Sequence, residues 1–374
     1  METIVLGANH NNTLGLIWSL GEAGHNVTLL LYKQKNNYVS KSKYIKKCYY
    51  IDAEADDTIS CLIKISRELD SKPVVFVSSD NDAELLNNHI HELSPFCVFE
   101  GNLTDSSIND YRDKDYGNEL AKKCGFTLPN CWVVNNPQEI NRLNLSFPII
   151  IKANNSVHGG KAAMKKCEDY DDASAFISSL PNAYYPLQIQ EFIEKDYEIM
   201  LLGCSLDGGN NVVCPIANRK IRQYPKPTGL VSYSESLAVR HHDDLNDLAN
   251  RVARYVREIG YTGLFSAEFL YKRGVYYFLE INLRNDGTSW LSTCSGYNLP
   301  DMVSYGLNGK YYPNNCSFQK KYYMNIVADF HYVKDGSISF IKWLRLFNKN
   351  ACFSHLNFRD IKPFIYYIRS LLKH

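Results

Sequence analysis

The chain has 374 residues, a length that predicts two or three domains rather than one hydrophobic core. Hydrophobic residues make up 45% and charged residues 22%, a balance typical of a globular protein. Forty-one Lys and Arg against 40 Asp and Glu leave a net charge of +1, which excludes a chain-wide field that would attract nucleic acid or an acidic membrane. An anionic ligand must therefore be bound by a local cluster of residues.

The eleven cysteines are scattered without a Cys-x-x-Cys pair, which argues against a zinc site and against a disulfide framework. They fit a reducing cytoplasm. The N-terminal stretch "METIVLGANH" enters a strand at once and lacks the regions of a signal peptide. No apolar run approaches the roughly 20 residues that span a bilayer. We therefore expect a cytoplasmic protein without a membrane span.

A β-α-β unit opens the chain. Residues 3–7 predict a short buried strand, residues 14–24 a helix and residues 26–32 a second strand, which together begin a parallel sheet. Residues 72–82 predict another strand that ends in a polar loop, followed by a helix from about Ala83. Ligands commonly bind at such loops. The first loop lacks G-x-G-x-x-G and the chain lacks G-x-x-x-x-G-K-[ST], so a nicotinamide-binding protein and a P-loop nucleotidase are disfavoured.

The middle of the chain alternates between helix and strand. Residues 111–134 predict a helix with Gly125 at its C-terminus and then an extended segment. A strand begins at Phe147, and further strands follow within residues 187–213, with a bend near residues 193–196. After residue 310 the chain is aromatic and basic, and residues 362–374 predict a final helix that docks on the protein rather than on a membrane.

Residues 266–286, "SAEFLYKRGVYYFLEINLRND", predict a β-hairpin with a three-residue loop at 272–274, which pairs Tyr271 with Val275. In that register the even-numbered residues share one face and the odd-numbered residues 275–283 face a core. The shared face then carries Glu268, Glu280, Asn282 and Arg284. Such oxygen ligands suit Mg²⁺ bound to an anionic substrate. The alternative is a solvated face with chance ion pairs, because a slip of one residue would separate the two acids.

Four features in chain order resemble the ATP-grasp superfamily: Lys114, the strand residue Lys152 before a glycine loop, the bend at "QEFI" and the paired carboxylates. The resemblance runs to about residue 310 and is strongest to the branch with D-aspartate ligases, formate-using glycinamide ribonucleotide transformylases, biotin carboxylases and carbamoyl phosphate synthetases. It implies an α/β (α+β) ATP-grasp fold with an N-terminal Rossmann-like domain. The implied parts are the N-terminal domain at 1–110, a lid at 111–189, a large subdomain at 190–310 and a C-terminal extension at 311–374.

The resemblance also implies roles for individual residues in nucleotide binding. Two lysines and a glycine loop would contact the ATP phosphates, the main chain of the bend would contact adenine, and one acid would contact ribose. These residues are Lys114, Lys152, His158, Gly159, Gly160, Glu191, Ile193 and Glu198. A solvated lysine at position 114, a plain exposed turn at 154–161 and a surface acid at position 198 are the alternatives.

For the metal and the chemistry, the resemblance implies that Glu268, Glu280 and Asn282 bind Mg²⁺, with Mn²⁺ as an alternative, and that Arg284 faces an acyl phosphate or a substrate carboxylate. The stretch "RKIRQYP" resembles the aspartate-ligase branch. Strand alternation puts Arg219 on one face and Lys220 and Arg222 on the other, so we predict that the latter two face the γ-phosphate or an acidic substrate. A solvated basic strand is the alternative.

These features predict an ATP-dependent carboxylate–amine ligase that forms an amide through an acyl phosphate and releases ADP and phosphate. The alternatives are carboxylation through carboxyphosphate, as in biotin carboxylases and purine biosynthesis, and a nucleotide-binding module without turnover. The expected partners are a small carboxylate and a small amine, with no nucleic acid and no membrane span. The sequence does not decide whether the protein forms a homodimer.

Overall fold

The structure is a computed structural model that describes residues 1–34, 36–52, 55–101, 107–112, 114–153, 164–226, 229–313 and 315–372. The chain forms two compact units. Unit 1 comprises residues 1–106, 199–266 and 282–374, and unit 2 comprises residues 107–198 and 267–281. Each unit is described by itself. The three predicted domain boundaries stay predictions.

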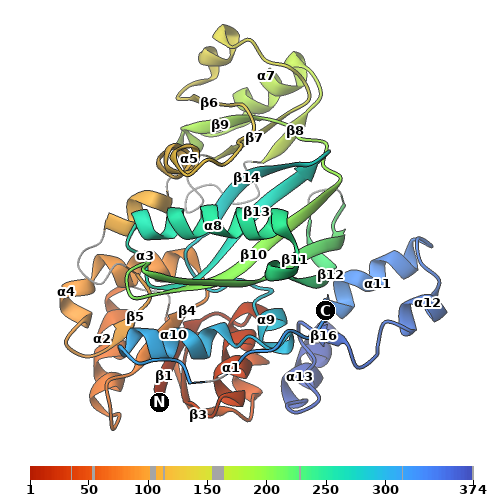
Figure 1. The fold of residues 1–374 in the computed structure, drawn as a ribbon. Helices are drawn as coiled ribbons and strands as arrows, with labels where there is room; N and C mark the ends of the chain where they lie inside the picture. The colour runs from red at the N-terminus through yellow and green to blue at the C-terminus, as the bar shows by residue number, and fades with distance from the viewer. Residues whose placement is uncertain are drawn as a thin grey trace. The chain divides into compact units, whose positions relative to one another are not determined.

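Unit 1 begins with a five-stranded parallel sheet in the order β3-β2-β1-β4-β5 (Figure 1). Its strands are β1 (Glu2–Gly7), β2 (Asn26–Tyr32), β3 (Ile45–Ile51), β4 (Val74–Val77) and β5 (Val98–Phe99). The helices are α1 (Asn11–Glu22), α2 (Ala55–Arg67), α3 (Asp80–Asn88) and α4 (Ile90–Leu93). The predicted β-α-β unit is confirmed. Helix α3 begins before the predicted Ala83, because the Ser79 side chain accepts a hydrogen bond from the Asp82 N–H and caps it.

A seven-stranded sheet has the order β14-β13-β10-β11-β12-β15-β16. Its strands are β10 (Tyr197–Leu206), β11 (Asn211–Tyr224), β12 (Leu230–Ala238), β13 (Gly263–Lys272), β14 (Val275–Asn282), β15 (Tyr322–Met324) and β16 (Ala351–Phe353). The connections include η6 (Val239–His241), α8 (Asp243–Glu258), α9 (Trp290–Cys294) and α10 (Leu299–Leu307). Helix α8 buries one apolar face, which includes Leu245, Val252 and Val256, and it crosses β11 (Figure 1). Helices α9 and α10 pack on α1.

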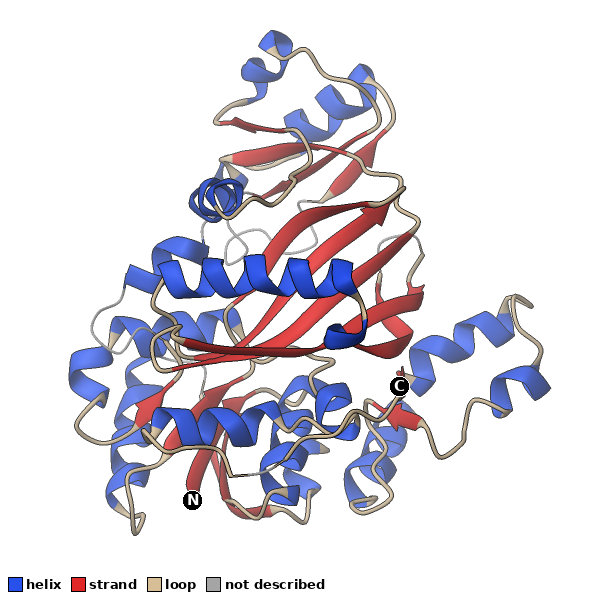
Figure 2. Ribbon diagram, viewed as in Figure 1, coloured by secondary structure: helices blue, strands red, loops and turns tan. Residues whose placement is uncertain are grey.

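Unit 2 contains a four-stranded antiparallel sheet in the order β6-β9-β7-β8 (Figure 2). Its strands are β6 (Cys131–Val134), β7 (Ile149–Ala153), β8 (Lys165–Cys167) and β9 (Leu187–Glu191), and its helical segments are η2 (Ser107–Arg112), α5 (Lys114–Lys123), η3 (Pro137–Arg142), α7 (Tyr170–Ser179) and η5 (Asn182–Tyr184). Ile149, Ile151 and Ile189 are fully buried on one face, where they form a core with residues of α7. Gly125 follows α5 with a φ of 84°, which confirms its predicted place at the helix end.

The hairpin of β13 and β14 differs from the prediction in its loop. Arg273 and Gly274 have φ values of 47° and 89°, so two residues rather than three join the strands. Positive φ at both positions is typical of a type I′ turn. The pairing therefore places Lys272 opposite Val275, and the ring centroids of Phe269 and Phe278 lie 5.7 Å apart. The predicted pairing of Tyr271 with Val275 is therefore wrong.

The buried face of β14 also differs from the prediction. Phe278 is 3% exposed and stacks on Phe126, with 4.9 Å between ring centroids. Its N–H donates to the Thr127 carbonyl oxygen at 2.8 Å. By contrast, Val275 is 37% exposed and residues 277, 279 and 281 are only half-buried. The expectation that the odd-numbered residues face the core is wrong here, and only Leu283 fulfils it.

The end of the chain forms three further helices of unit 1. It comprises α11 (Ile326–Lys334), α12 (Phe340–Leu344) and α13 (Lys362–Leu371), and the last of these confirms the predicted final helix. Helix α13 packs on the short helix η1 (Val39–Lys41). The rings of Tyr38, His355 and Tyr367 lie between them, with centroid distances from 4.0 to 5.6 Å. Within the described part of the chain, no helix combines the length and apolarity needed to cross a bilayer.

Burial makes His355 a source of acid sensitivity. Burial, with a smaller effect from His10, lowers the His355 pKa from 6.5 to about 3. Between these values the unfolded chain binds a proton that the folded chain does not, so stability falls as the pH drops below 6.5. We expect a loss of about 1.4 kcal/mol per pH unit. His355→Phe should flatten the dependence of the unfolding temperature on pH, whereas His91→Phe, at an exposed position, should not. Equal slopes for both variants would contradict this assignment.

Candidate active site

Lys152 lies on the polar face of the four-stranded sheet in unit 2. It is half-buried on β7, directly opposite Gln188 of β9, and its Nζ donates to the Gln190 Oε1 at 3.1 Å. Gln188 is 1% exposed, and its Nε2 has no hydrogen-bond partner among the described residues. A buried amide donor without a partner is costly. This face thus presents a cation and an amide donor, groups that fit phosphate oxygens. The sequence pattern had not pointed to Gln188.

The "QEFI" bend leaves β9 at Glu191. The Glu191 N–H donates to the Asn130 carbonyl oxygen at 2.8 Å, and its carboxylate accepts from the Asn130 side chain at 3.0 Å. These bonds fix Glu191 and occupy its N–H. Ile193 is 4% exposed, and neither its N–H nor its carbonyl oxygen has a backbone partner in the described part of the chain. Of the two residues predicted to meet adenine, Ile193 is therefore the one whose N–H has no backbone partner among the described residues.

Glu198, the predicted ribose ligand, lies near the start of β10 and forms an ion pair with Lys195. Its side chain is 11% exposed. The remaining nucleotide predictions fall outside the described parts: this applies to His158, Gly159 and Gly160, and to the side chain of Lys114, although the backbone of Lys114 begins α5. Their roles stay predictions.

The two predicted metal acids lie on the hairpin, Glu268 on β13 and Glu280 on β14, and both are half-buried. Continued without interruption, the observed register puts Glu268 opposite Leu279, on the other face from Glu280. A site that uses both acids therefore requires a one-residue β-bulge between the turn and Glu280. In the described part of the chain, no three His, Cys, Asp or Glu side chains cluster as metal ligands. The predicted set has only two acids and an amide, so its role stays a prediction.

Arg284 is held by a carboxylate within unit 1. Its Nε and Nη2 donate to the two Asp80 oxygens at 3.1 and 3.0 Å, and Nη2 also donates to the Asn282 Oδ1 at 3.1 Å. Both charged side chains are partly buried, at 16% and 26% exposure. Because two guanidinium nitrogens donate to the two oxygens of one carboxylate, the guanidinium is fixed in one orientation. Asp80, the first residue of α3, was not singled out because its partner is 204 residues away.

Further polar residues gather at the carboxyl ends of β1 and β4, where the strand order of the parallel sheet reverses. Open α/β sheets commonly bind ligands at such a point. The Asn12 side chain bridges the carbonyl oxygens of Ser78 and Asn285 at 2.9 and 3.1 Å. Burial lowers the His10 pKa, and the nearby Asp286 carboxylate opposes this shift. The polar loops that follow β1 and β4 thus lie side by side, and residues 285–286 join them.

The basic stretch on β11 is rearranged by a bulge. Lys220 pairs with Ser234 and Arg222 with Tyr233, so Ile221 is the extra residue. Because neighbouring residues of β12 point to opposite faces, Arg222 shares a face with Arg219, and the Arg222 guanidinium lies 4.2 Å from the Tyr233 ring centroid. The predicted common face of Lys220 and Arg222 is therefore wrong.

Arg222 and Arg219 both bind carboxylates. Arg222 donates through Nε and Nη2 to the fully buried Asp329 of α11, both at 2.8 Å. Asp329 also accepts from the Ser232 hydroxyl at 2.9 Å and the Trp343 indole N–H at 3.0 Å. Arg219 pairs with Glu235, which Lys320 also contacts at 2.7 Å. These contacts connect β11 to the C-terminal segment.

Lys220 has different surroundings, because its face of β11 and β12 is polar. Asn218 and Ser234 on this face are buried, and the Asn218 Oδ1 and the Ser234 Oγ have no partner among the described residues. The Asn218 Nδ2 donates to the Thr288 hydroxyl at 3.0 Å, which in turn donates to Asp286 at 2.6 Å. A chain of polar groups thus runs from the Lys220 face toward Asp286 in unit 1.

The sequence of this chain is similar to those of two kinds of ligase or synthase. The chain is 24% identical over 290 residues to the carbamoyl phosphate synthase large chain of Saccharolobus solfataricus, a match that covers 75% of this chain and 26% of that protein. It is 23% identical over 269 residues to D-aspartate ligase of Enterococcus faecium, which covers 66% of this chain and 62% of that protein. The matched region thus spans about a quarter of the length of the carbamoyl phosphate synthase large chain and less than two thirds of the length of D-aspartate ligase.

Among solved structures, the ADP complex of N5-carboxyaminoimidazole ribonucleotide synthetase is similar, with a TM-score of 0.68 at 13% identity. The match covers 90% of this chain and 84% of that one. This likeness shows the fold. Residues 119–296 match the family model of the ATP-grasp domain. Residues 119–296 thus resemble an ATP-grasp domain, and the chain shares the mixed α/β fold of this synthetase.

Proposed function

We propose that this protein is an ADP-forming ligase that joins a carboxylate to an amine. In this reaction the γ-phosphoryl group of ATP passes to the carboxylate, the amine attacks the acyl phosphate, and an amide, ADP and phosphate result. The ATP-grasp domain and the similarity to D-aspartate ligase support this proposal. The observation that carries it is the partnerless buried Nε2 of Gln188 beside Lys152, which gives this domain a place for phosphate oxygens.

Mg²⁺, with Mn²⁺ as an alternative, would neutralise charge on the phosphates. We propose that Glu268, Glu280 and Asn282 hold it. Carboxylate and amide oxygens fit this hard cation. Arg284 donates to Asn282 and is itself anchored by Asp80, so its proposed role is to orient the Asn282 amide as well as to meet a substrate anion. Orientation of this kind supplies much of the catalysis in phosphoryl transfer.

We place the carboxylate substrate at Lys220 rather than at Arg222. The Lys220 face carries the partnerless atoms of Asn218 and Ser234, which can bind a polar substrate, whereas Asp329 already occupies the Arg222 guanidinium. A compact ammonium suits a carboxylate or phosphate oxygen. The polar chain through Thr288 and Asp286 then extends this surface within unit 1.

Trapping with hydroxylamine tests the proposal directly. The purified protein is incubated with ATP, Mg²⁺, hydroxylamine and a panel of carboxylates that includes D-aspartate and other amino acids. We expect one member of the panel to give a hydroxamate together with an equal amount of ADP, because hydroxylamine intercepts an acyl phosphate. Replacing hydroxylamine with a panel of amines then identifies the second substrate.

Other results would support the alternatives. The similarity to carbamoyl phosphate synthase favours carboxyphosphate chemistry as the second candidate. In that case bicarbonate alone would stimulate ADP release, and no carboxylate in the panel would give a hydroxamate. An absence of ADP release with every carboxylate and with bicarbonate, despite measurable ATP binding, would favour a nucleotide-binding module and contradict the ligase.

A further inference from the structure

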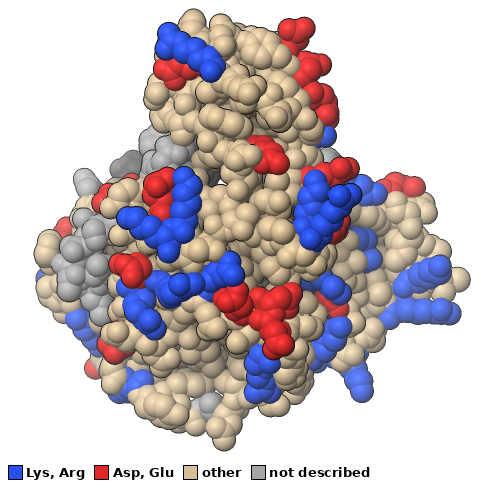
Figure 3. Space-filling view, turned by 45° about the horizontal axis from the view of Figure 1, so that its top comes forward, with Lys and Arg blue, Asp and Glu red and all other residues tan. Residues whose placement is uncertain are grey.

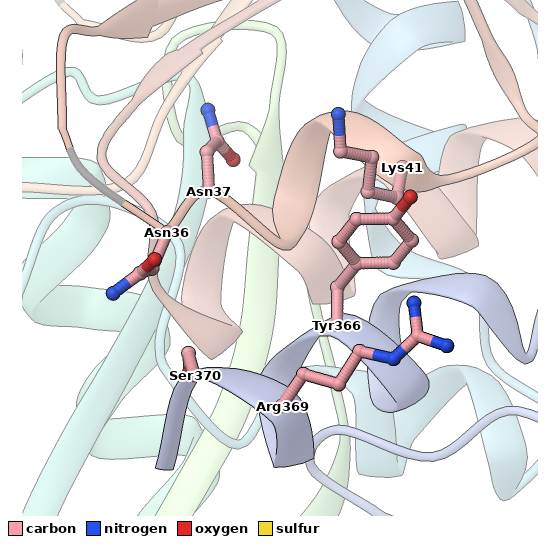
Figure 4. Close-up of a pocket in the computed structure, with 6 residues that line it drawn as sticks. All are labelled: Asn36, Asn37, Lys41, Tyr366, Arg369 and Ser370. Carbon is pink, nitrogen blue, oxygen red and sulfur yellow. The ribbon is translucent and has the colours of Figure 1, made fainter. Parts of the chain in front are cut away.

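A polar pocket lies between η1 and α13 in unit 1, beside the aromatic rings of Tyr38 and Tyr367. Its volume is about 300 Å³, the lower end of the range for small-ligand sites (Figure 4). The loop before η1, η1 itself and the last turns of α13 form its wall. The lining residues are Asn36, Asn37, Lys41, Tyr366, Arg369 and Ser370. None lies within residues 119–296, which match the ATP-grasp domain, so the pocket shares no residue with the proposed nucleotide site.

The two chain segments that line this pocket carry basic residues, of which Lys33 is paired with Asp52 just outside them. Residues 33–51 contain six lysines and no Asp or Glu, and residues 361–374 contain three Lys or Arg and again no acid. This contrasts with the net charge of +1 for the whole chain and with the mixed charges on the surface in Figure 3. A local excess of one sign attracts a ligand of the opposite sign.

The two cations in the pocket, Lys41 and Arg369, both lie near the ring of Tyr366. The Lys41 Nζ lies 5.2 Å from the Tyr366 ring centroid, and the Arg369 guanidinium carbon lies 5.7 Å from it (Figure 4). Contact with a ring face offsets only part of the cost of bringing like charges together. Neither cation forms an ion pair with any residue that the structure describes. The pocket therefore has positive charge that no described carboxylate neutralises.

The wall of the pocket is held in place by residues behind it. Asn9, from the loop after β1, accepts hydrogen bonds from the N–H groups of Tyr38 and Val39 at 3.0 and 3.1 Å and donates to the Asn36 carbonyl oxygen at 3.2 Å. On the other side, Tyr38 contacts Tyr367 of α13. A site fixed in this way loses little conformational freedom when a ligand binds.

The pocket also offers a hydrogen-bond donor. The Asn37 Oδ1 accepts from the Ser40 N–H at 3.1 Å, which leaves the Nδ2 as a donor. That nitrogen is buried and has no partner among the described residues. An ammonium, a guanidinium and an amide are each donors that suit the acceptor oxygens of a phosphate group. We propose that this pocket binds a phosphate group, carried either by a small phosphorylated compound or by a lipid headgroup.

Binding of inorganic phosphate to the full-length protein, measured by calorimetry, tests the proposal. Lys41→Gln combined with Arg369→Gln should weaken phosphate binding at least about tenfold, because both charged donors are lost. The matched control combines Lys47→Gln with Lys362→Gln, two exposed cations of the same segments that do not line the pocket, and should leave binding unchanged.

Sedimentation with vesicles distinguishes the two sources of phosphate. If the ligand is a lipid headgroup, the protein should sediment with phosphatidylglycerol vesicles but not with phosphatidylcholine vesicles, and the Lys41 and Arg369 variant should lose this binding. If the ligand is a small compound, phosphate binds and neither vesicle does. The proposal is overturned if neither phosphate nor anionic vesicles bind, or if the control pair weakens binding as much as the pocket variant.

Discussion

Glu280→Gln should lower ATP turnover at least about a hundredfold and leave the fold intact. Loss of one metal-binding carboxylate removes several kcal/mol of charge stabilisation from phosphoryl transfer. The side chain is only half-buried, and the structure records no hydrogen bond or ion pair from its carboxylate to any described residue, so stability should change little. Turnover measured over a range of Mg²⁺ concentrations, together with the unfolding temperature, checks both expectations.

Glu194→Gln is the matched control, because Glu194 is an exposed acid of unit 2 with no predicted role. It should retain full activity. Full activity in Glu280→Gln would reject the metal assignment. Glu268→Gln adds a test of the hairpin register: if a bulge brings the two acids together, both variants should raise the Mg²⁺ requirement, whereas an uninterrupted register predicts this effect for one alone.

Arg222→Ala should destabilise the protein by about 3 kcal/mol, since removal of one partner leaves a buried charge without compensation. Asp329 is fully buried and would keep only the Ser232 and Trp343 donors. We therefore expect a lower unfolding temperature and faster proteolysis of α11 and α12. Replacing Arg222 and Asp329 together by Leu should recover much of the stability, because the uncompensated charge is gone.

Lys226→Ala gives the control for this experiment. Lys226 pairs with Asp335 at 3.1 Å in the same region, but both side chains are about half exposed. Exposed pairs contribute at most about 1 kcal/mol. If Arg222→Ala instead retains the stability of the unsubstituted protein and loses turnover, the earlier catalytic assignment of Arg222 would hold and its structural role would be rejected.

Local patterns predicted the first β-α-β unit and the final helix, because an apolar run or an amphipathic face is legible within a few residues. The same patterns did not predict two local features of the backbone. Arg273 adopts a positive φ, which is unusual for a residue other than Gly and shortens the hairpin loop. Ile221 forms a bulge that turns Arg222 to the face of Arg219. Each shifts a register by one residue and thereby reverses which side chains share a face.

The partners of the charged residues could not be predicted at all. Asp80 and Asp329 lie 204 and 107 residues from the arginines that they bind, and no spacing rule links positions so far apart. The partnerless amide of Gln188 was equally invisible, because only the pairing of β7 with β9 shows that it is buried opposite Lys152. The order of motifs identified the family, whereas the geometry of the site depends on contacts between distant segments.

The C-terminal strands also determine how this protein can be shortened. β15 pairs with β12, and β16 pairs with β15, so the last strands of the chain cover hydrogen-bonding groups of β12. A truncation after residue 310 would expose this strand as a sheet edge, and such edges pair readily with other chains. It would also remove Asp329 and leave Arg222 without its carboxylate. Residues 311–374 therefore protect the protein from aggregation, and an isolated ATP-grasp fragment should be poorly soluble.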